Sequence, residues 1–161
     1  MAIQYTGPTT YNCYLTSLAS GAARSSVSIA TDTTKNVVDA LVSVSIVTTA
    51  TAPSGNKQYT VYGYLTGATT AGAFNGSDTS PDNVDGTDKL ITLGSPTNLV
   101  FLGTIQANQG AAAVGLRGVF SVRQAFGCMP AHWGVVVVND SGTAASASSP
   151  STISVTQVYY T

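Results

Sequence analysis

The sequence contains no glutamate, so all seven of its acidic residues are aspartates, and it has only six lysines and arginines. Charged residues make up 8% of the chain, against about 25% in an average soluble domain. A free monomer usually keeps a charged surface, because charge opposes association. The scarcity of charge therefore predicts a subunit whose neutral surface is covered within a larger assembly.

The few basic residues are scattered: they are Arg24, Lys35, Lys57, Lys89, Arg117 and Arg123. Nucleic-acid binding needs a basic patch that neutralises phosphates, so we expect no nucleic-acid partner. Apolar runs such as Val135 to Val138 are far shorter than the ~20 residues that cross a bilayer. The first residues also lack the charged and apolar regions of a signal peptide. We therefore expect a soluble protein, made in the cytoplasm, with no membrane partner.

Histidine and cysteine are almost absent too. His132 is the one histidine, and no Gly-x-Ser-x-Gly elbow presents a nucleophile to it. With Cys13 and Cys128 as the two cysteines, no zinc-ligand spacing exists, so we expect no catalytic residue, no cofactor and no enzymatic activity. A cytoplasmic origin favours two buried, reduced thiols. A disulfide between Cys13 and Cys128 is the less favoured alternative.

What the chain has in quantity is β-branched residues that alternate with small polar ones, which is the pattern of half-buried strands. This pattern predicts an all-β fold, a single antiparallel β-sandwich of about eight strands, jelly-roll-like, over residues 13–161. The clearest strand segments are 26–29, 42–46, 58–65, 90–93, 99–105, 133–138 and 153–159. Gly103 marks a candidate β-bulge, and residues 139–142, Asn-Asp-Ser-Gly, predict a turn.

One short helix is predicted at residues 121–126. Ser121 is a suitable N-cap, and Gly127 can take the left-handed conformation after the last turn.

Residues 66–88 are predicted to form a long surface loop rich in Gly, Ala, Thr, Asn and Asp. Within it, Asp82, Asp85 and Asp88 are the candidates for a metal site, because calcium takes hard oxygen ligands from Gly-containing loops. An EF-hand loop in this register would begin on Pro81 and would have Thr92 in place of its last glutamate. Turns stabilised by aspartate side chains are therefore the favoured interpretation of the cluster.

Residues 1–12 contain little alternation and allow two interpretations. They form either an extended N-terminal arm, which contacts a neighbouring subunit through Ile3, Tyr5 and Tyr11, or a first edge strand of the same domain. The sequence leaves both open.

Tyrosine is comparatively frequent, and its aromatic face suits stacking on sugars. A glycan-binding platform would draw on Tyr59, Tyr62, Tyr64, Tyr159 and Tyr160. Tyrosine is also a common filler of strands and interfaces, and this is the favoured interpretation.

Residues 125–144 read Ala-Phe-Gly-Cys-Met-Pro-Ala-His-Trp-Gly-Val-Val-Val-Val-Asn-Asp-Ser-Gly-Thr-Ala. This stretch resembles the C-terminal part of small virion proteins of tailed bacteriophages, in which a Gly-x-x-Pro stretch runs into a Trp-Gly strand and an Asn-x-x-Gly turn. Residues 14–19 and 23–25 are similar to the same group.

The resemblance implies a structural protein of the virion, assembled in the cytoplasm of a host bacterium. The leading expectation is a capsid decoration or cement protein that binds the major capsid protein as a homo-oligomer, with a trimer as one form, and stabilises the head lattice. The alternative is a tail, baseplate or fibre component that contacts other virion proteins, with glycan receptor binding as one of its roles.

Overall fold

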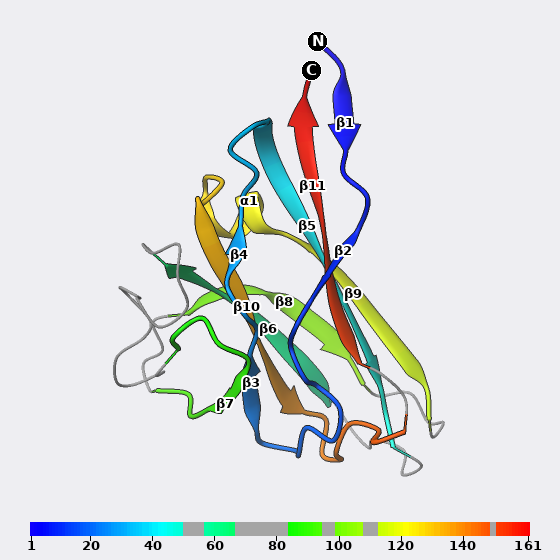
Figure 1. The fold of residues 1–161 in the computed structure, drawn as a ribbon. Coiled ribbons are helices and arrows are strands. Elements are labelled where there is room, and N and C mark those ends of the chain that lie inside the picture. Colours follow the sequence, from blue (N-terminus) through cyan, green and yellow to red (C-terminus); the bar gives the residue numbers. More distant parts are fainter. Residues whose placement is uncertain (50–56, 67–83, 95–98, 108–112, 149–150) are drawn as a thin grey trace.

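Two antiparallel β-sheets lie face to face in the computed structural model (Figure 1). The structure describes residues 1–49, 57–66, 84–94, 99–107, 113–148 and 151–161, and these contain eleven strands and one short helix. The expected all-β sandwich is confirmed, with more strands than the sequence predicted. None of the helical segments in the described ranges is long and apolar enough to span a membrane.

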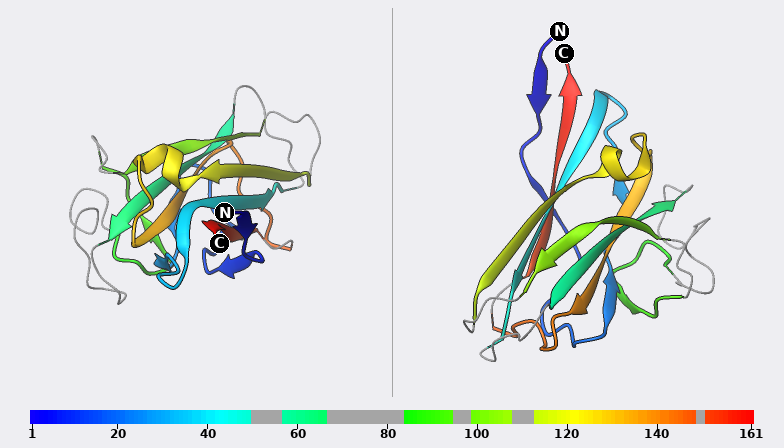
Figure 2. Two further views of the ribbon diagram at one scale, coloured as in Figure 1. Left: turned by 90° about the horizontal axis from the view of Figure 1, so that it is seen from above. Right: turned by 180° about the vertical axis from the view of Figure 1, so that it is seen from behind.

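The first sheet has the order β1-β11-β5-β9, with β2 also paired to β11. Its strands are β1 (Ile3–Tyr5), β2 (Thr9–Tyr11), β5 (Asn36–Val47), β9 (Gly115–Ser121) and β11 (Thr152–Tyr160). Both N-terminal strands run along β11 of the same chain, since Ile3 lies opposite Tyr160 and Tyr11 lies opposite Ile153. The structure thus shows the edge-strand alternative for residues 1–12, and the two termini lie side by side (Figure 2).

The second sheet has the order β7-β3-β10-β6-β8, with β4 also paired to β10. Its strands are β3 (Ala23–Ser25), β4 (Ile29–Ala30), β6 (Gln58–Thr66), β7 (Lys89–Ile91), β8 (Val100–Gln106) and β10 (His132–Asp140). The chain crosses between the sheets from β2 to β3, from β4 to β5, from β5 to β6 and at each step from β8 to β11. These crossings place β5 and β10 in the interior of their sheets.

The core lies between the two sheets and follows the period-two pattern of the strands. Val42, Val44 and Ile46 of β5 are fully buried, while Ser43 and Ser45 between them face outward. Opposite them, β10 contributes the odd-numbered residues Trp133, Val135 and Val137, and β6 contributes Tyr59 and Val61. Alternation in the sequence therefore predicted the inner face of β5 correctly, whereas the continuous apolar run of β10 carries no such signal.

The outer face of the second sheet is also covered, and by the chain itself. Tyr64, Val136 and Val138 point away from the main core and form a second apolar cluster. Val84, Ile91 and Leu99 pack over them. The end of the predicted surface loop is consequently part of a core: Val84 is 1% exposed. This coverage explains why Val135 to Val138 is a continuous apolar run, since both faces of β10 are buried.

The helix α1 (Val122–Phe126) begins and ends as predicted. The Ser121 hydroxyl accepts a hydrogen bond from the Gln124 N–H at 3.0 Å, and Gly127 has a φ of 75° with its N–H donating to the Arg123 carbonyl. The Phe126 ring packs against β6 at Gly63, where a Cβ atom would lie 2.6 Å from it. A glycine at position 63 is therefore what lets Phe126 of the helix pack closely against β6.

The candidate bulge at Gly103 is confirmed. In the pairing of β6 with β8, Val61 lies opposite Gly103 but Tyr62 lies opposite Phe101, so Leu102 is the extra residue.

Three local predictions were wrong. Residues 26–28 interrupt the predicted first strand, because the Ser26 hydroxyl accepts the Val135 N–H at 3.0 Å and Val27 and Ser28 turn away to bond Asn12 and Gly86. Alternation over residues 58–65 places Leu65 on one face with Tyr59 and Val61, and Tyr64 on the other, but Leu65 is exposed instead of lying in the core. Asn139 and Asp140 belong to β10, so the turn begins after them.

Candidate interaction surface

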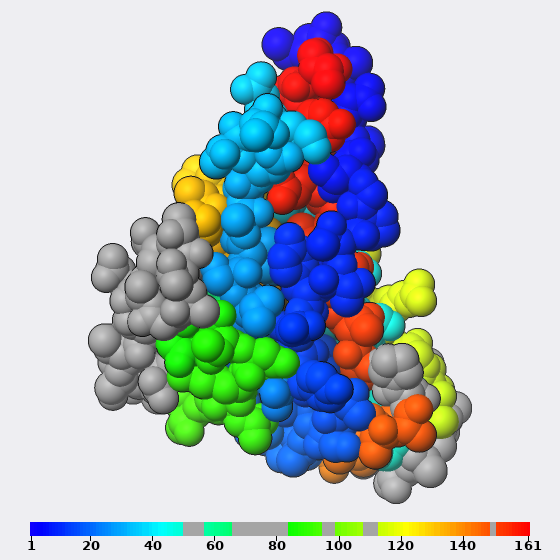
Figure 3. Space-filling model, viewed as in Figure 1, coloured from blue at the N-terminus to red at the C-terminus, as the bar shows by residue number. Residues whose placement is uncertain are grey.

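The end of the first sheet that carries both termini presents an apolar surface. Ile3 and Tyr5 of β1 are 55% and 61% exposed, and they lie opposite Tyr160 and Val158 of β11. Residues directly opposite in antiparallel strands point to the same face. Ile3, Tyr5, Val158 and Tyr160 therefore form one cluster, which we name the apolar tip. The two ends of the chain, to which these residues belong, lie together at the top of the molecule (Figure 3).

The tip is braced from behind by the segment that connects β4 to β5. The Gln157 side chain accepts the Asp32 N–H at 2.9 Å and donates to the Ala30 carbonyl at 3.2 Å. Lys35 Nζ lies 4.9 Å from the centre of the Tyr159 ring, a cation–π distance. Because β11 is held by this segment on its inner face, the tip is preorganised on its outer face, which lowers the entropy cost of binding.

Asp32 anchors the bracing segment. Its carboxylate accepts hydrogen bonds from the hydroxyl and the N–H of Thr34 and pairs with Lys35 at 3.1 Å. These contacts, with the Thr34 hydroxyl first, lower the pKa of Asp32 to about 2. The carboxylate is therefore ionised over the whole physiological range, and the turn keeps its geometry there.

Of the three predicted arm residues, the structure separates Tyr11 from the other two. Tyr11 lies opposite Ile153 and packs, partly buried, against the main core, and this burial raises the pKa of its phenol. Ile3 and Tyr5 are on the exposed face, and their contact with a neighbour stays a prediction. The sequence did not reveal Val158 and Tyr160 as their partners, because only the pairing of the two ends of the chain brings them together.

The calcium candidates that the structure describes already have partners. Asp85 pairs with Lys89 at 2.7 Å and accepts hydrogen bonds from Thr87. Burial raises the pKa of Asp85, but the bonds from Lys89 and Thr87 outweigh it and leave the pKa below its ordinary value. Asp88 pairs with Arg24 and accepts the Tyr14 N–H. Asp82 lies outside the described residues.

Asp85 thus forms the side-chain turn that the favoured interpretation predicted. Within the ranges that the structure describes, His, Cys, Asp and Glu side chains nowhere gather in a group of three that could hold a metal ion.

His132 lines a small pocket of about 270 Å³ together with Ser28 and Asp88. These are the residue types of a nucleophilic triad, but such a triad needs hydrogen bonds from the histidine to both partners. Among the described contacts, neither Ser28 nor Asp88 is hydrogen-bonded to His132, and the Asp88 carboxylate is committed to Arg24 and Tyr14. The pocket therefore lacks the geometry that would activate a serine.

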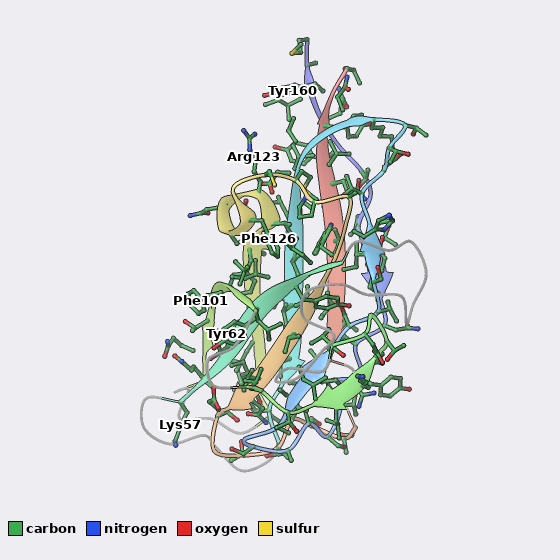
Figure 4. The ribbon with its side chains drawn as sticks, turned by 90° about the vertical axis from the view of Figure 1, so that its left-hand side faces the viewer. Lys57, Tyr62, Phe101, Arg123, Phe126 and Tyr160 are labelled. Atoms are coloured by element: carbon green, nitrogen blue, oxygen red, sulfur yellow. The ribbon has the colours of Figure 1, made fainter. Side chains whose placement is uncertain are left out.

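The five tyrosines of the predicted glycan platform do not share a surface. Tyr59 is buried in the main core and Tyr64 in the second cluster. Tyr62 stands on the outer face of β6, where it contacts Phe101 of β8 edge to face with ring centres 6.0 Å apart. Tyr159 and Tyr160 lie at the far end of the first sheet (Figure 4). A five-tyrosine platform is therefore excluded by alternation along β6.

The two cysteines are free and differ in their environments: Cys13 is buried and Cys128 is exposed. The expectation of two buried thiols was thus wrong for Cys128, which follows α1 in an exposed turn. Burial, followed by the charge of Asp88, raises the pKa of the Cys13 thiol against the opposing effect of Arg24. A buried thiol that stays protonated is unreactive.

We expect native protein to react rapidly with a thiol reagent such as DTNB at one site per chain, and at a second site only after unfolding. The fast reaction should disappear in Cys128→Ser and persist in Cys13→Ser. If the native chain showed no fast reaction under non-reducing conditions but two thiols after reduction, the assignment of Cys13 and Cys128 as free cysteines would be wrong.

A scan against protein-family models and a search of curated proteins found no match to this chain.

Proposed function

We propose that the chain is a structural protein of a tailed-bacteriophage particle, a decoration protein that binds the head lattice through the apolar tip. The observation that carries the proposal is the tip itself: four apolar side chains, braced from behind, on a chain with very little charge. Exposed apolar clusters of this kind mark interaction sites.

The resemblance to small virion proteins supports the proposed class of protein, but it does not include the residues of the apolar tip. Residues 125–144 cover the end of α1, the whole of β10 and the turn after it. Packing governs that segment, because seven consecutive β10 residues, from Trp133 to Asn139, are buried. The binding role is therefore argued from the tip and from composition.

The mechanism would be mechanical. Burial of apolar area contributes about 25 cal/mol per Å², and tyrosine adds a hydrogen-bonding hydroxyl at the rim of a contact. Each tip is small, so a single contact would be weak. Repetition over a lattice makes modest contacts persistent, because an oligomer held through several tips rarely loses all of them together.

The test of the role is the stoichiometry in purified particles of the phage that encodes the chain, measured by quantitative mass spectrometry. A decoration protein is expected in proportion to the major capsid protein. Copies in proportion to tail proteins would instead support the tail, baseplate or fibre alternative. Absence from the particle would overturn the virion proposal altogether.

The test of the tip is a pair of charged variants. We expect Ile3→Asp combined with Tyr5→Asp to lower the amount of chain that sediments with particles by about tenfold or more, which corresponds to ~1.4 kcal/mol. Both side chains are mostly exposed, so the fold should be retained. Leu90→Asp, at a residue of β7 that is 62% exposed, is the matched control and should bind normally. Equal binding by all three proteins would exclude the tip.

A further inference from the structure

The two sheets have four edges, and three of them carry features that oppose pairing with another strand. Natural sheets protect their edges with charge, proline, very short strands or β-bulges. The β1–β2 edge is interrupted at Gly7 and Pro8, β7 has three residues and includes Lys89, and β9 carries an exposed Arg117 at its centre. These edges are unsuited to strand addition.

The fourth edge, β8, is protected only by the bulge at Leu102. Its seven residues, Val-Phe-Leu-Gly-Thr-Ile-Gln, include neither a charge nor a proline. In the described part of the chain β8 pairs with β6 alone. Phe101 of β8 is 56% exposed. An uncharged, apolar edge of this length is the kind that recruits another strand.

The hydrogen-bond pattern shows which backbone groups face outward. The Ala107 N–H donates to the Lys57 carbonyl at 2.8 Å, so Ala107 and Lys57 are a hydrogen-bonded pair. Such pairs alternate along an antiparallel ladder, which directs Ile105 toward β6 and directs the N–H and C=O groups of Thr104 and Gln106 away from it. These groups are available to a strand on the other side.

A groove runs beside β8 and leaves room for that strand. It has a volume of about 640 Å³ and lies between β8 and β9, with α1 at one end; its lining is uncharged and consists of Phe101, Leu102, Gly103, Thr104, Val119, Phe120, Ser121, Gln124 and Ala125. Phe101 stands at its rim beside Tyr62 (Figure 4). Val119, 63% exposed, stands on the outer face of β9 at the margin of the groove.

Two glycines keep the groove open. A Cβ atom at Gly103 or Gly118 would lie 2.5 or 2.6 Å from the Phe120 ring. The ring therefore lies across both glycines as a floor between the two sheets. A larger residue at either position would push the ring outward and fill the space beside β8.

We propose that a second copy of this chain occupies this edge, with its β8 pairing antiparallel to the first β8 across a two-fold axis. Identical strands related by a two-fold axis are antiparallel and present the same patch to each other. The neutral lining favours a neutral partner, and β8 itself is such a partner. Phe101 of both copies packs into the contact, and the six-stranded sheet continues from one subunit into the next.

The size of the contact sets its expected strength. Seven strand residues at about 3.3 Å each span about 23 Å, across sheet edges about 10 Å apart. These spans give about 230 Å², and side chains that project from both outer faces roughly double the width, to about 500 Å² per copy, slightly below the ~600–1,000 Å² per partner of standard interfaces. We therefore expect a reversible dimer that dissociates in the micromolar range. The pairing would supply the self-association of the proposed decoration protein, but it concerns the isolated chain and needs no particle.

The test is the oligomeric state of the purified full chain, measured by sedimentation velocity from micromolar to near-millimolar concentration. The unmodified chain should form dimers. Thr104→Pro removes one outward N–H and leaves the ladder to β6 intact, and Phe101→Lys places a charge at the rim. Each variant should raise the dissociation constant at least tenfold, whereas Leu90→Lys on the β7 edge should leave it unchanged.

Circular dichroism would show whether each variant is folded, and if Thr104→Pro is not, Phe101→Lys on the exposed rim decides the matter. A chain that stays monomeric, a trimer, or a dimer that survives Phe101→Lys would overturn the proposal. Any of these results would leave binding of the tip to particles unaffected, so the two proposals fail separately.

Discussion

Gly134→Ala is expected to destabilise the protein by roughly 2–6 kcal/mol, a large share of the ~5–15 kcal/mol that holds a typical domain. A Cβ atom at this position of β10 would lie 2.1 Å from the Tyr64 ring. Tyr64 cannot move aside freely, because it is 1% exposed and its hydroxyl donates to the Ser26 carbonyl at 2.8 Å. Overpacking costs about 1–3 kcal/mol, and loss of a buried hydrogen bond costs about 1–3 kcal/mol more.

Urea unfolding of the variant measures this cost. Gly115→Ala is the matched control, since Gly115 also lies in a strand but has nothing within 4 Å of an added Cβ. Tyr64→Leu shortens the opposing side chain, so the double variant with Gly134→Ala should be less destabilised than the sum of the two single variants. Simple additivity would show that the ring and the glycine do not meet.

The Gly134 contact also shows what the sequence could and could not predict. Alternation placed Tyr64 on the opposite face of β6 from Tyr59, which is correct. It did not show that this second face is covered, because Val84, Ile91 and Leu99 reach it only after a long intervening segment. Because the sequence does not show which face of β6 is covered, its tyrosines were also compatible with a sugar-binding platform.

Short-range signals were the most reliable part of the sequence. The caps of α1 depend on Ser121 and Gly127 within one turn of the chain, and both were found. The strand β9 was missed because Arg117 and Gly118 interrupt its apolar residues. Leu116, Gly118 and Phe120 nevertheless keep period two, with a glycine where the Phe120 ring needs space. Reading that glycine as an inward-facing position would have recovered the strand.

The candidate surfaces depend on pairings between distant parts of the chain. The tip joins residues 3–5 to residues 158–160, and the groove joins β8 to β9 through a ring that spans two glycines. Neither pairing has a local signature. Scarcity of charge directs attention to the surface, but only the sheet order shows which strands lie at the edges of the sheets.

A buried amide joins the end of β10 to the N-terminal half of the chain, and its replacement should have a comparably large effect. Asn139 is fully buried. Its amide nitrogen donates to the carbonyls of Leu18 and Thr143 at 2.7 and 2.8 Å, and its side-chain oxygen accepts the N–H and the hydroxyl of Ser141. Both the amide nitrogen and the side-chain oxygen of Asn139 are therefore hydrogen-bonded. The residue connects the end of β10 to Leu18 and to the turn at residues 141–143.

Asn139→Ala removes these bonds and leaves the Ser141 N–H buried without its acceptor. Leu18 and Thr143 retain other donors, from Ala145 and from the Ser141 hydroxyl. We therefore expect a loss of about 3 kcal/mol, since a stranded buried group costs about 1–3 kcal/mol and the remaining bonds contribute less each. Asp140→Ala, at the exposed neighbouring residue, is the control and should change stability little.

Asn139→Asp keeps the shape of the side chain but replaces its hydrogen-bond-donating NH₂ group by an oxygen. An ionised carboxylate would face the Leu18 and Thr143 carbonyls without a proton to donate, in a site with no water contact, so its folded-state pKa should lie above the unfolded value. The folded state then binds the proton more tightly, and stability falls as pH rises from the unfolded pKa to the folded one. Denaturant unfolding from acidic to neutral pH should show this decline in Asn139→Asp and not in Asn139→Ala. Parallel pH profiles for the two variants would mean that water reaches the side chain at position 139, so that the Asn139 amide is not buried as described above.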